Sequence, residues 1–194
     1  AATASKMFGV EIEKVTREMR SRAKTANFGI IYGISSFGLS RRLTIGRKEA
    51  KDLIDGYFSS YPGVKRYMDE SIAKAREQGY VTTMFGRRRY LRDIHSRNQV
   101  VRGNAERNAI NAPIQGTAAD IIKIAMVRIF DRLNAAKLAS KMILQVHDEL
   151  IFEVVPEELE KLKDIVLYEM TNAAKLDVPL KVDWGTGRNW LEAH

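Results

Sequence analysis

The sequence predicts an α+β protein that is mainly helical and carries one antiparallel hairpin toward its C-terminal end. Segments with apolar residues three and four positions apart, bounded by glycine or proline, fill much of the 194-residue chain. Two apolar runs separated by three polar residues follow at 141–155, as in a hairpin. The composition, 45% hydrophobic and 29% charged, is that of an ordinary globular protein.

The composition also excludes several classes of protein. No apolar run approaches the roughly 20 residues of a membrane-spanning helix, and no signal peptide is visible at the N-terminus. The absence of cysteine excludes disulfides and thiolate metal sites, and it fits a reducing cytoplasm.

Positive charge is concentrated in the first half of the chain. Residues 1–107 contain 22 Lys and Arg against 11 Asp and Glu, a net charge of +11. Residues 108–194 contain 10 against 13, a net charge of −3, and the two halves together give the overall +8. A basic half suggests a polyanionic partner, with nucleic acid as the first candidate, although basic charge can also serve solubility alone.

Glycine, proline and serine divide the first 78 residues into short helical segments. Gly9 ends the first of them, and Pro62 can start the last. The opening residues Ala1–Ala4 have no capping signal, so we expect a cut from a longer chain. We predict helices within 1–10, 11–33, 34–43, 48–60 and 62–78.

The helix within 11–33 is the segment around which the chain is organised. It places Arg20, Lys24, Phe28 and Tyr32 at successive i,i+4 positions, in one stripe about 18 Å long. The two cations suit a polyphosphate, and the two aromatic rings suit its sugar and base. The simpler interpretation is an amphipathic helix with solvated cations and core aromatics.

Two glycines weaken that simpler interpretation. Gly29 and Gly33 lie in the same segment, and each interior glycine costs a helix about 1 kcal/mol relative to alanine. We therefore expect another group to approach closely there, or the helix to end.

A short strand is predicted at 80–85, followed by a turn at 86–90. Arg87, Arg88 and Arg89 lie in that turn, where flexible backbone lets them converge on a phosphate backbone. A solvated basic loop is the alternative.

A long helical pattern runs from about Ser96 to Leu133 and contains Pro113, which predicts a kink or a break near Ala112. Its core-facing stripe comprises Ala118, Ile122, Ala125, Met126, Ile129 and Leu133. Arg107, Asn111 and Gln115, four residues apart, could read a base edge or bond the carbonyls that the proline leaves unpaired.

The hairpin at 141–155 carries His147, Asp148 and Glu149 at or near its tip. Adjacent carboxylates at the end of buried strands are costly unless they hold a cation or a proton. Hard oxygen ligands favour magnesium or manganese. Equally, both acids can be ordinary turn residues.

After the hairpin we expect an amphipathic helix at 156–171, a short strand at 180–184, and a terminal turn at 185–194 with Trp190 in the core.

Several of these segments resemble family A DNA polymerases, the bacterial DNA polymerase I type. The spacing Arg20-x3-Lys24-x3-Phe28-x3-Tyr32-Gly33 is similar to the nucleotide-binding helix of their fingers. The segment 145–149, Gln-Val-His-Asp-Glu, is similar to their third polymerase motif, in the palm. Segments 85–90 and 111–120 also look like family segments, and the resemblance covers essentially all 194 residues in the family's order.

The resemblance implies a helical fingers subdomain at 1–97 and part of an antiparallel-sheet palm at 98–194. Arg20 and Lys24 would hold the incoming triphosphate, with Lys24 also counted as catalytic. Phe28 would pack on the sugar and base, and Tyr32 would stand at the insertion site.

The same resemblance implies a metal site and a DNA-binding surface. Asp148 and Glu149 would be the catalytic, magnesium-binding carboxylates, and His147 would contact the primer terminus. The remaining DNA contacts would come from Arg107, Asn111 and Gln115 along the nascent duplex, and from Arg87, Arg88 and Arg89 on phosphates.

The implied reaction is template-directed DNA synthesis, in which a dNTP is joined to a primer 3′ hydroxyl with two Mg²⁺ ions, or Mn²⁺. It would serve DNA replication and repair on primer-template DNA, in the bacterial cytoplasm at the nucleoid and not at a membrane.

One expected part of the site is absent from the chain. In the family another metal-binding Asp comes from a palm strand upstream of the segment that corresponds to Ala1, and the thumb also lies outside these residues. Two carboxylates cannot fix two ions in octahedral geometry. We therefore expect a fragment that is inactive or nearly so, with an exposed sheet edge. The alternatives are a non-catalytic basic nucleic-acid-binding module and a purely structural helical protein.

Overall fold

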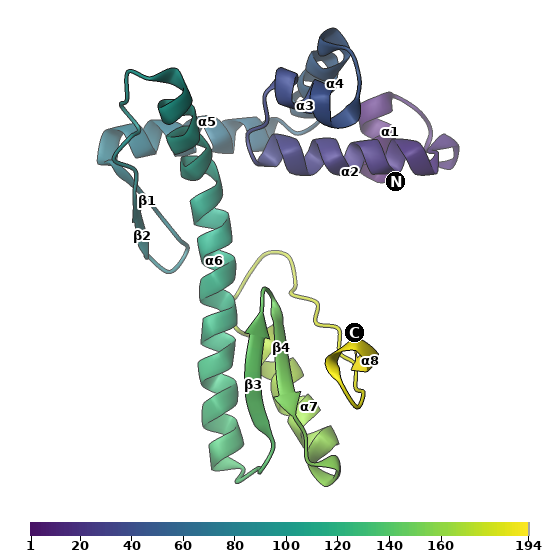
Figure 1. The fold of residues 1–194 in the computed structure, drawn as a ribbon, viewed down its shortest axis with the longest axis vertical. Coiled ribbons are helices and arrows are strands. Elements are labelled where there is room, and N and C mark those ends of the chain that lie inside the picture. Colours follow the sequence, from purple (N-terminus) through teal and green to yellow (C-terminus); the bar gives the residue numbers. More distant parts are fainter. Residues whose placement is uncertain (194) are drawn as a thin grey trace. The chain divides into compact units, whose positions relative to one another are not determined.

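Helices dominate the chain and accompany two separate two-stranded antiparallel sheets (Figure 1). The computed structural model describes residues 1–193, and within them no helix is both long and apolar enough to cross a membrane. The predicted α+β class is confirmed. The elements are α1 (Ala2–Phe8), the 3₁₀ helix η1 (Ile12–Lys14), α2 (Arg17–Ile31), α3 (Ser36–Leu43), α4 (Arg47–Ser60), α5 (Pro62–Gln78), β1 (Tyr80–Thr82), β2 (Arg88–Tyr90), α6 (Gln99–Ala135), β3 (Lys141–Val146), β4 (Glu149–Glu153), the 3₁₀ helix η2 (Pro156–Glu158), α7 (Leu159–Thr171) and α8 (Trp190–Ala193).

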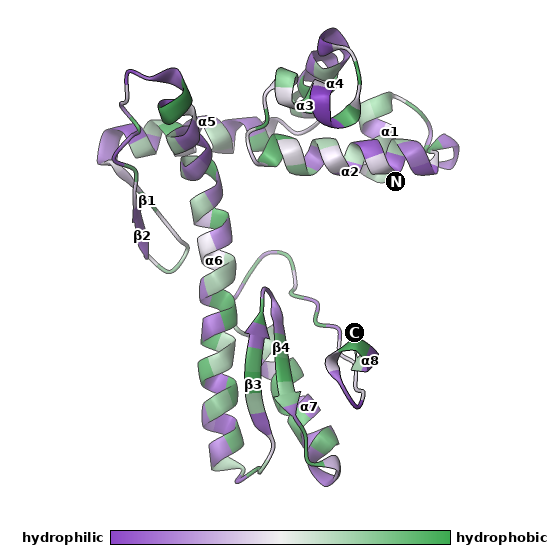
Figure 2. Ribbon diagram, in the orientation of Figure 1, coloured by the Kyte–Doolittle hydropathy of each residue, from purple (hydrophilic) through white to green (hydrophobic). Residues whose placement is uncertain are grey.

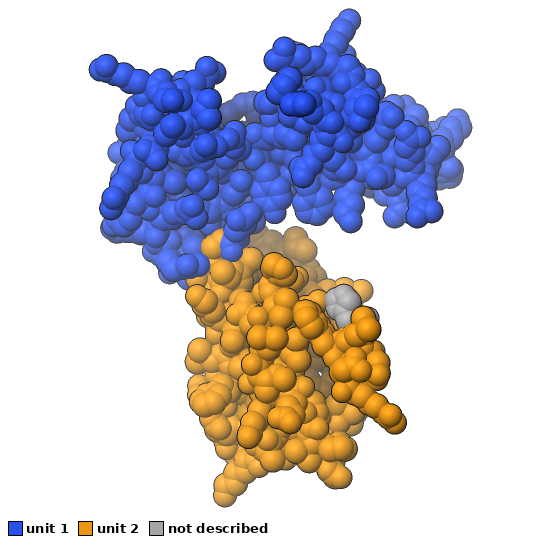
Figure 3. Space-filling view, in the orientation of Figure 1, with its two compact units in different colours: residues 1–115 blue, residues 116–194 orange. Residues whose placement is uncertain are grey.

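The chain forms two compact units, residues 1–115 and 116–194, which Figure 3 colours separately. The division falls within α6. The predicted boundary between residues 97 and 98 concerns functional subdomains, and it stays a prediction.

The first unit has two clusters of buried side chains. One joins α2, α3 and α4 and comprises Ala26, Ile30, Leu39, Ala50, Leu53 and Tyr57. The other joins α5, β1 and the start of α6 and comprises Ala75, Val81, Leu91, Ile94, Ala105 and Ala109. All five helices expected before residue 79 are present, and Gly9 and Gly79 end theirs with φ of 64° and 75°.

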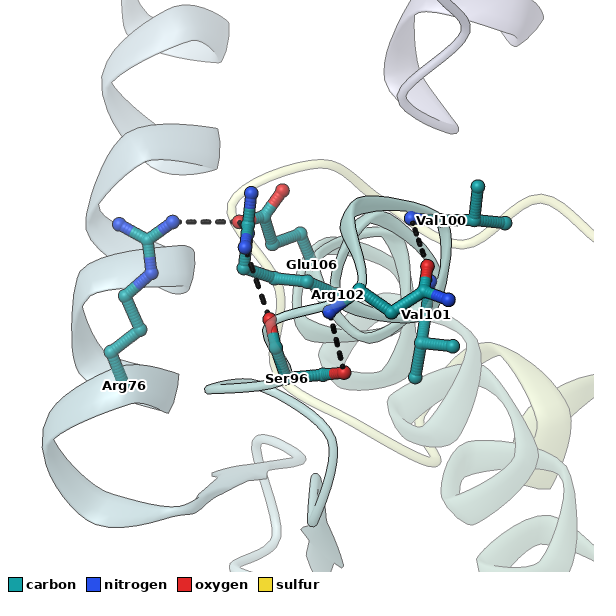
Figure 4. A network of polar contacts seen from close by, with 7 residues as sticks. Arg76, Ser96, Val100, Val101, Arg102 and Glu106 are labelled. Atoms are coloured by element: carbon teal, nitrogen blue, oxygen red, sulfur yellow. Dashed lines mark hydrogen bonds and ion pairs between the residues drawn. The ribbon is translucent and has the colours of Figure 1, made fainter.

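Polar contacts fix the start of α6 against α5 (Figure 4). Asn98 caps the helix, because its Oδ1 accepts from the backbone N–H of Val100 at 2.9 Å. One guanidinium nitrogen of Arg102 donates to the carbonyl of Ser96 at 3.0 Å. Arg76 of α5 donates to Glu106 at 2.6 Å, so α5 and α6 are tied together at the residue directly before Arg107.

The prediction near Ala112 is a kink or a break. A break is wrong, because α6 is helical without interruption from Gln99 to Ala135 with Pro113 inside it, and the kink stays a prediction. A proline inside a helix removes one backbone hydrogen bond. Here the helix continues because residues on both sides of Pro113 pack into buried clusters. The core-facing stripe is largely confirmed: Ile122, Ala125, Ile129 and Leu133 are buried, whereas Ala118 is exposed. Part of this stripe packs with Leu162 and Ile165 of α7.

The second unit contains the predicted hairpin, in which β3 and β4 pair antiparallel with a bulge between Met142 and Leu144. Hydrophobic residues occupy the middle of both strands (Figure 2). Leu150 and Phe152 of β4 pack against the cluster of α6 and α7. The expectation of buried strands is wrong for β3, since Ile143 and Leu144 are 59% and 50% exposed.

A carboxylate holds the base of the hairpin. Glu158 accepts from the backbone N–H groups of Ala139 and Ser140 and from the Ser140 hydroxyl, at 2.6–2.9 Å. These hydrogen bonds, with that from the hydroxyl first, lower the pKa of Glu158 below the usual range for glutamate. The start of β3 is thereby tied to η2.

Two expectations for the C-terminal segment are wrong. Residues 180–184 form no strand, because no neighbouring edge pairs with them among the described residues. Trp190 does lie in a terminal helical turn, α8, but it is 48% exposed and is not a core residue.

Candidate nucleotide and nucleic-acid site

Helix α2 buries its apolar face and exposes Arg20, Lys24 and Phe28, and Tyr32, directly after the helix, is also exposed. Thr16 caps the helix by accepting from the N–H of Met19 at 3.1 Å. Its buried residues are Ala23, Ala26, Gly29 and Ile30. The simpler interpretation, with aromatics in the core, is therefore wrong, since Phe28 and Tyr32 are 49% and 43% exposed.

The end of α2 explains both glycines. The N–H of Ile34 bonds the carbonyl of Gly29 at 2.8 Å and that of Gly33 bonds Ile30 at 2.9 Å, the pair of bonds of a Schellman end. Gly33 has φ of 73°, which favours glycine. A Cβ on Gly29 would lie 3.0 Å from Cγ2 of Ile34. Both predicted causes are thus present: the helix ends, and a side chain approaches closely.

Tyr32 accordingly lies just beyond the helix, with φ of −87° and ψ of 12°. It belongs to the turn that leads into α3 and not to the helical stripe itself. Its backbone N–H still bonds the carbonyl of Phe28 at 3.1 Å, so its position remains set by the last turn of α2.

The two cations of the stripe are available to an anion. Neither Arg20 nor Lys24 makes an ion pair with any acid of residues 1–193, and both line an open hollow of about 740 Å³ between α1 and α2. Arg22 on the same helix differs, because it pairs with Glu18 at 2.9 Å and with Glu49 at 3.8 Å. A guanidinium and an ammonium group that lie one helical turn apart, without acidic partners among the described residues, are well suited to bind a polyphosphate.

The hairpin of the second unit brings its three polar residues together as predicted. Val146 pairs with Glu149, so His147 and Asp148 form a two-residue turn, and both are exposed. His147 has φ of 55°, a strained value for a residue with a side chain. Gln145 holds this turn, since its Nε2 donates to the carbonyl of His147 at 2.9 Å.

The two carboxylates differ in their surroundings. Asp148 points from the exposed turn, whereas Glu149 is half-buried and accepts from Nε1 of Trp190 at 3.3 Å. Their oxygens suit a hard divalent cation. Among residues 1–193, however, no group of three or more His, Asp and Glu side chains is arranged to hold a metal ion. The carboxylates of Asp148 and Glu149 can therefore supply part of the ligands of one metal ion, but they are too few to bind two ions.

The arginine segment is placed differently from the prediction. Arg88 and Arg89 lie on strand β2, which pairs with β1, and the turn between the strands comes earlier. Side chains alternate along a strand: Arg88 stacks on the ring of Tyr80 at 4.7 Å, and Arg89 reaches Oδ1 of Asn108 at 3.4 Å. Arg88 and Arg89 therefore face opposite sides of β2, whereas Arg87 lies in the connection before the strand.

Arg107, Asn111 and Gln115 occupy successive turns of α6 within the first unit, as their spacing predicts. Arg107 and Gln115 are exposed, and Arg107 donates to Asn104. Oδ1 of Asn111 is buried and has no hydrogen-bond partner among the described residues. A buried acceptor without a partner is costly, which favours a donor from a bound molecule at this point.

Sequence reasoning missed the partner of Glu149. Trp190 is 41 residues away in the chain, and only its type gave a signal, since an indole N–H usually finds an acceptor. The α2 residues lie in the first unit and the hairpin turn lies in the second.

Comparison with known proteins gives a consistent result. The family model for DNA polymerase family A matches residues 1–192. DNA polymerase I of Caldicellulosiruptor bescii is 53% identical over 190 residues, and that of Pseudomonas aeruginosa is 52% identical over 193 residues. The matches cover 98% and 100% of this chain but 22% and 21% of the relatives, so the chain spans about a fifth of their length.

A solved structure agrees with these relatives. The POL domain of Pol1 from M. smegmatis, in complex with DNA primer-template and dNTP, superimposes with a TM-score of 0.93 and 47% sequence identity. The match covers 98% of this chain and 34% of that one. On these matches, which extend over nearly every residue, the chain belongs to DNA polymerase family A.

Proposed function

We propose that this chain is the part of a template-directed DNA polymerase that holds the incoming dNTP and the primer terminus. The observation that carries the proposal is the exposed surface of α2, with two unpaired cations one turn from an exposed aromatic ring. Family membership supports it. So does the neighbouring POL domain, whose complex contains primer-template and dNTP.

Each residue of the stripe has a role in this proposal. Arg20 and Lys24 bind the triphosphate oxygens, and Lys24 in addition stabilises the charge that develops on the leaving pyrophosphate. Phe28 packs on the sugar and base. Tyr32, in the turn beyond the helix, stacks where the template base enters.

The second unit contributes to the reacting end of the primer. Asp148 and Glu149 share in binding Mg²⁺, with Mn²⁺ as a substitute. A divalent cation held there would activate the primer 3′ hydroxyl or neutralise charge on the leaving pyrophosphate. His147 contacts the primer terminus, and its strained backbone fixes where Asp148 points.

DNA contacts extend over the basic first half of the chain. Arg107, Asn111 and Gln115 line the duplex along α6, and the orphaned Oδ1 of Asn111 accepts from a base edge. Arg88 and Arg89 contact phosphates from the two faces of β2, and Arg87 does so from the connection just before the strand.

We infer that the isolated chain binds these substrates but does not extend a primer, because its described residues offer two clustered carboxylates and no larger group. In this proposal residues 1–97 are the fingers and residues 98–194 are part of the palm. The complete enzyme replicates and repairs DNA in the bacterial cytoplasm.

A non-catalytic nucleic-acid-binding module is the second candidate, favoured by the net charge of +11 on residues 1–107. Such a module binds DNA through phosphates alone, so its affinity falls with salt and ignores magnesium and nucleotides. The two candidates therefore differ in their response to a matched dNTP.

The decisive experiment measures fluorescence anisotropy of a labelled primer-template whose primer ends in a dideoxynucleotide. Under the polymerase proposal, Mg²⁺ with the dNTP that matches the template tightens binding, and a mismatched dNTP does not. Arg20→Ala abolishes the tightening, whereas Arg22→Ala, which removes an ion-paired cation from the same helix, preserves it. Equal affinities with and without the matched dNTP support the module instead. Vigorous primer extension by the chain alone contradicts the inferred inactivity.

A further inference from the structure

The last helical turn of the chain places a tryptophan against a carboxylate of the hairpin. Nε1 of Trp190 donates to Oε2 of Glu149 at 3.3 Å. Both residues belong to the second unit, where α8 lies beside the hairpin (Figure 1). Glu149 directly follows Asp148, so this contact reaches the carboxylate pair itself.

Reciprocal hydrogen bonds hold α8 in shape. Oδ1 of Asn189 accepts from the N–H of Glu192 at 3.1 Å. The Glu192 carboxylate in return accepts from the N–H of Arg188 at 3.0 Å and from Nδ2 of Asn189 at 2.8 Å. The arrangement is similar to a capping box, with the carboxylate bonded to the N–H of Arg188 instead of that of Asn189, and Trp190 is the first residue of the helix.

The preceding segment packs closely on the same turn. A Cβ on Gly187 would lie 2.5 Å from Cβ of Glu192 and 2.7 Å from the backbone nitrogen of Ala193. Only glycine permits this approach without displacing backbone. The chain is therefore folded back tightly around α8, although the segment is otherwise exposed.

Burial does not explain the position of Trp190. Its side chain is 48% exposed, and it belongs to none of the buried clusters. Its single donor instead meets an acceptor 41 residues away. The capped turn and the glycine contact fix the backbone from which this indole N–H projects.

We propose that Trp190 is a positioning residue, which holds the Glu149 carboxylate in one orientation beside Asp148 through its indole N–H. The inference rests on the proposed function in so far as Glu149 is taken as a metal ligand. Hydrogen bonds from outside the ligand set fix the orientation of a carboxylate ligand, and losing one typically weakens metal binding about tenfold or more.

The contact is tested directly by nuclear magnetic resonance of the ¹⁵N-labelled chain. The sequence has two tryptophans, so two indole N–H signals are expected, and Trp190→Phe assigns them. In Glu149→Gln, which leaves α8 untouched, the Trp190 proton moves upfield as it loses a charged acceptor. The Trp184 signal, from a ring that stacks with Lys163 at 4.0 Å, stays in place. An unchanged Trp190 signal overturns the proposal.

The consequence for metal binding is tested with Mn²⁺ as the probe, counted as free ion by electron paramagnetic resonance. Trp190→Phe weakens binding about tenfold, while Trp184→Phe leaves it unchanged. Equal affinities of the wild type and Trp190→Phe contradict the positioning role. Equal affinities of the wild type and Asp148→Asn instead reject the proposed metal site, and the indole signals still report whether the Trp190–Glu149 contact exists.

Discussion

Phe28 stands half exposed on α2, between Lys24 and the turn that contains Tyr32. If Phe28 were buried, its ring would be a core residue, and the i,i+4 spacing of the four side chains would indicate no binding surface. Exposure of a large ring costs hydrophobic stabilisation, and a binding partner for its face would restore it. Under the proposed function, Phe28 forms one wall of the nucleotide site, and its exposed ring is covered when the nucleotide binds.

A conservative change tests this placement. Phe28→Tyr adds a hydroxyl at the ring edge, where it can replace the hydrogen bond that a missing 3′ hydroxyl leaves open. In a complete polymerase carrying this chain, acceptance of dideoxynucleotides relative to deoxynucleotides should rise about tenfold, the worth of one hydrogen bond. Single-nucleotide incorporation kinetics measure the ratio. Unchanged discrimination would refute the position given to Phe28.

At the scale of elements, the end of α2 depends on Gly33, a glycine that is unexpected in a segment with helical periodicity. Gly33 has φ of 73°, and a Cβ there would lie 3.0 Å from Cγ of Arg107. The flexible Arg107 side chain can move aside, so the backbone conformation is the larger obstacle to substitution. Position 33, where α2 ends, therefore favours glycine over every other residue.

Two alanine substitutions separate conformation from helix propensity. Gly33→Ala should lower the free energy of unfolding by about 1–2 kcal/mol, because alanine disfavours positive φ. Gly56→Ala, inside α4 with nothing within 4 Å of its Cβ, should raise it by about 0.5–1 kcal/mol. Urea titrations give both values. The same sign for both variants would contradict the Schellman end.

The elements that could be predicted from the sequence are those whose limits are set locally. Pro62, Gly9 and Gly79 punctuate their helices through backbone geometry that no distant residue alters. The hairpin turn at His147 and Asp148 follows equally from two apolar runs around a polar triplet.

The failures share a different cause, which is dependence on distant partners. Strand β2 exists because β1 lies beside it, and α6 continues through Pro113 because both of its halves are packed. Residues 180–184 have strand composition but no strand to pair with among the described residues. The contact of Trp190 with Glu149 could not be predicted, since nothing in the spacing links residues 41 positions apart.

For the whole molecule, charge and site are divided between two units. The first unit holds the exposed cations of α2 and most of the positive charge, and the second holds the carboxylates of the hairpin turn. A polymerase needs both surfaces, together with more carboxylates than cluster within residues 1–193. Under the proposed function, the first unit supplies the nucleotide-holding surface and the second supplies carboxylates for the metal site.

The measurement that tests this most directly is primer extension by a chimera. This chain replaces the corresponding segment of Pseudomonas aeruginosa DNA polymerase I, to which it aligns over its full length. The chimera should extend a primer on a template within about tenfold of the parent's rate, since about half of the replaced residues are identical. Asp148→Asn in the chimera should abolish extension, while Asp131→Asn, at an exposed carboxylate of α6, should not. A folded chimera without activity, or an Asp148→Asn chimera as fast as its parent, would contradict the assignment of this chain as the nucleotide- and primer-holding part of a polymerase.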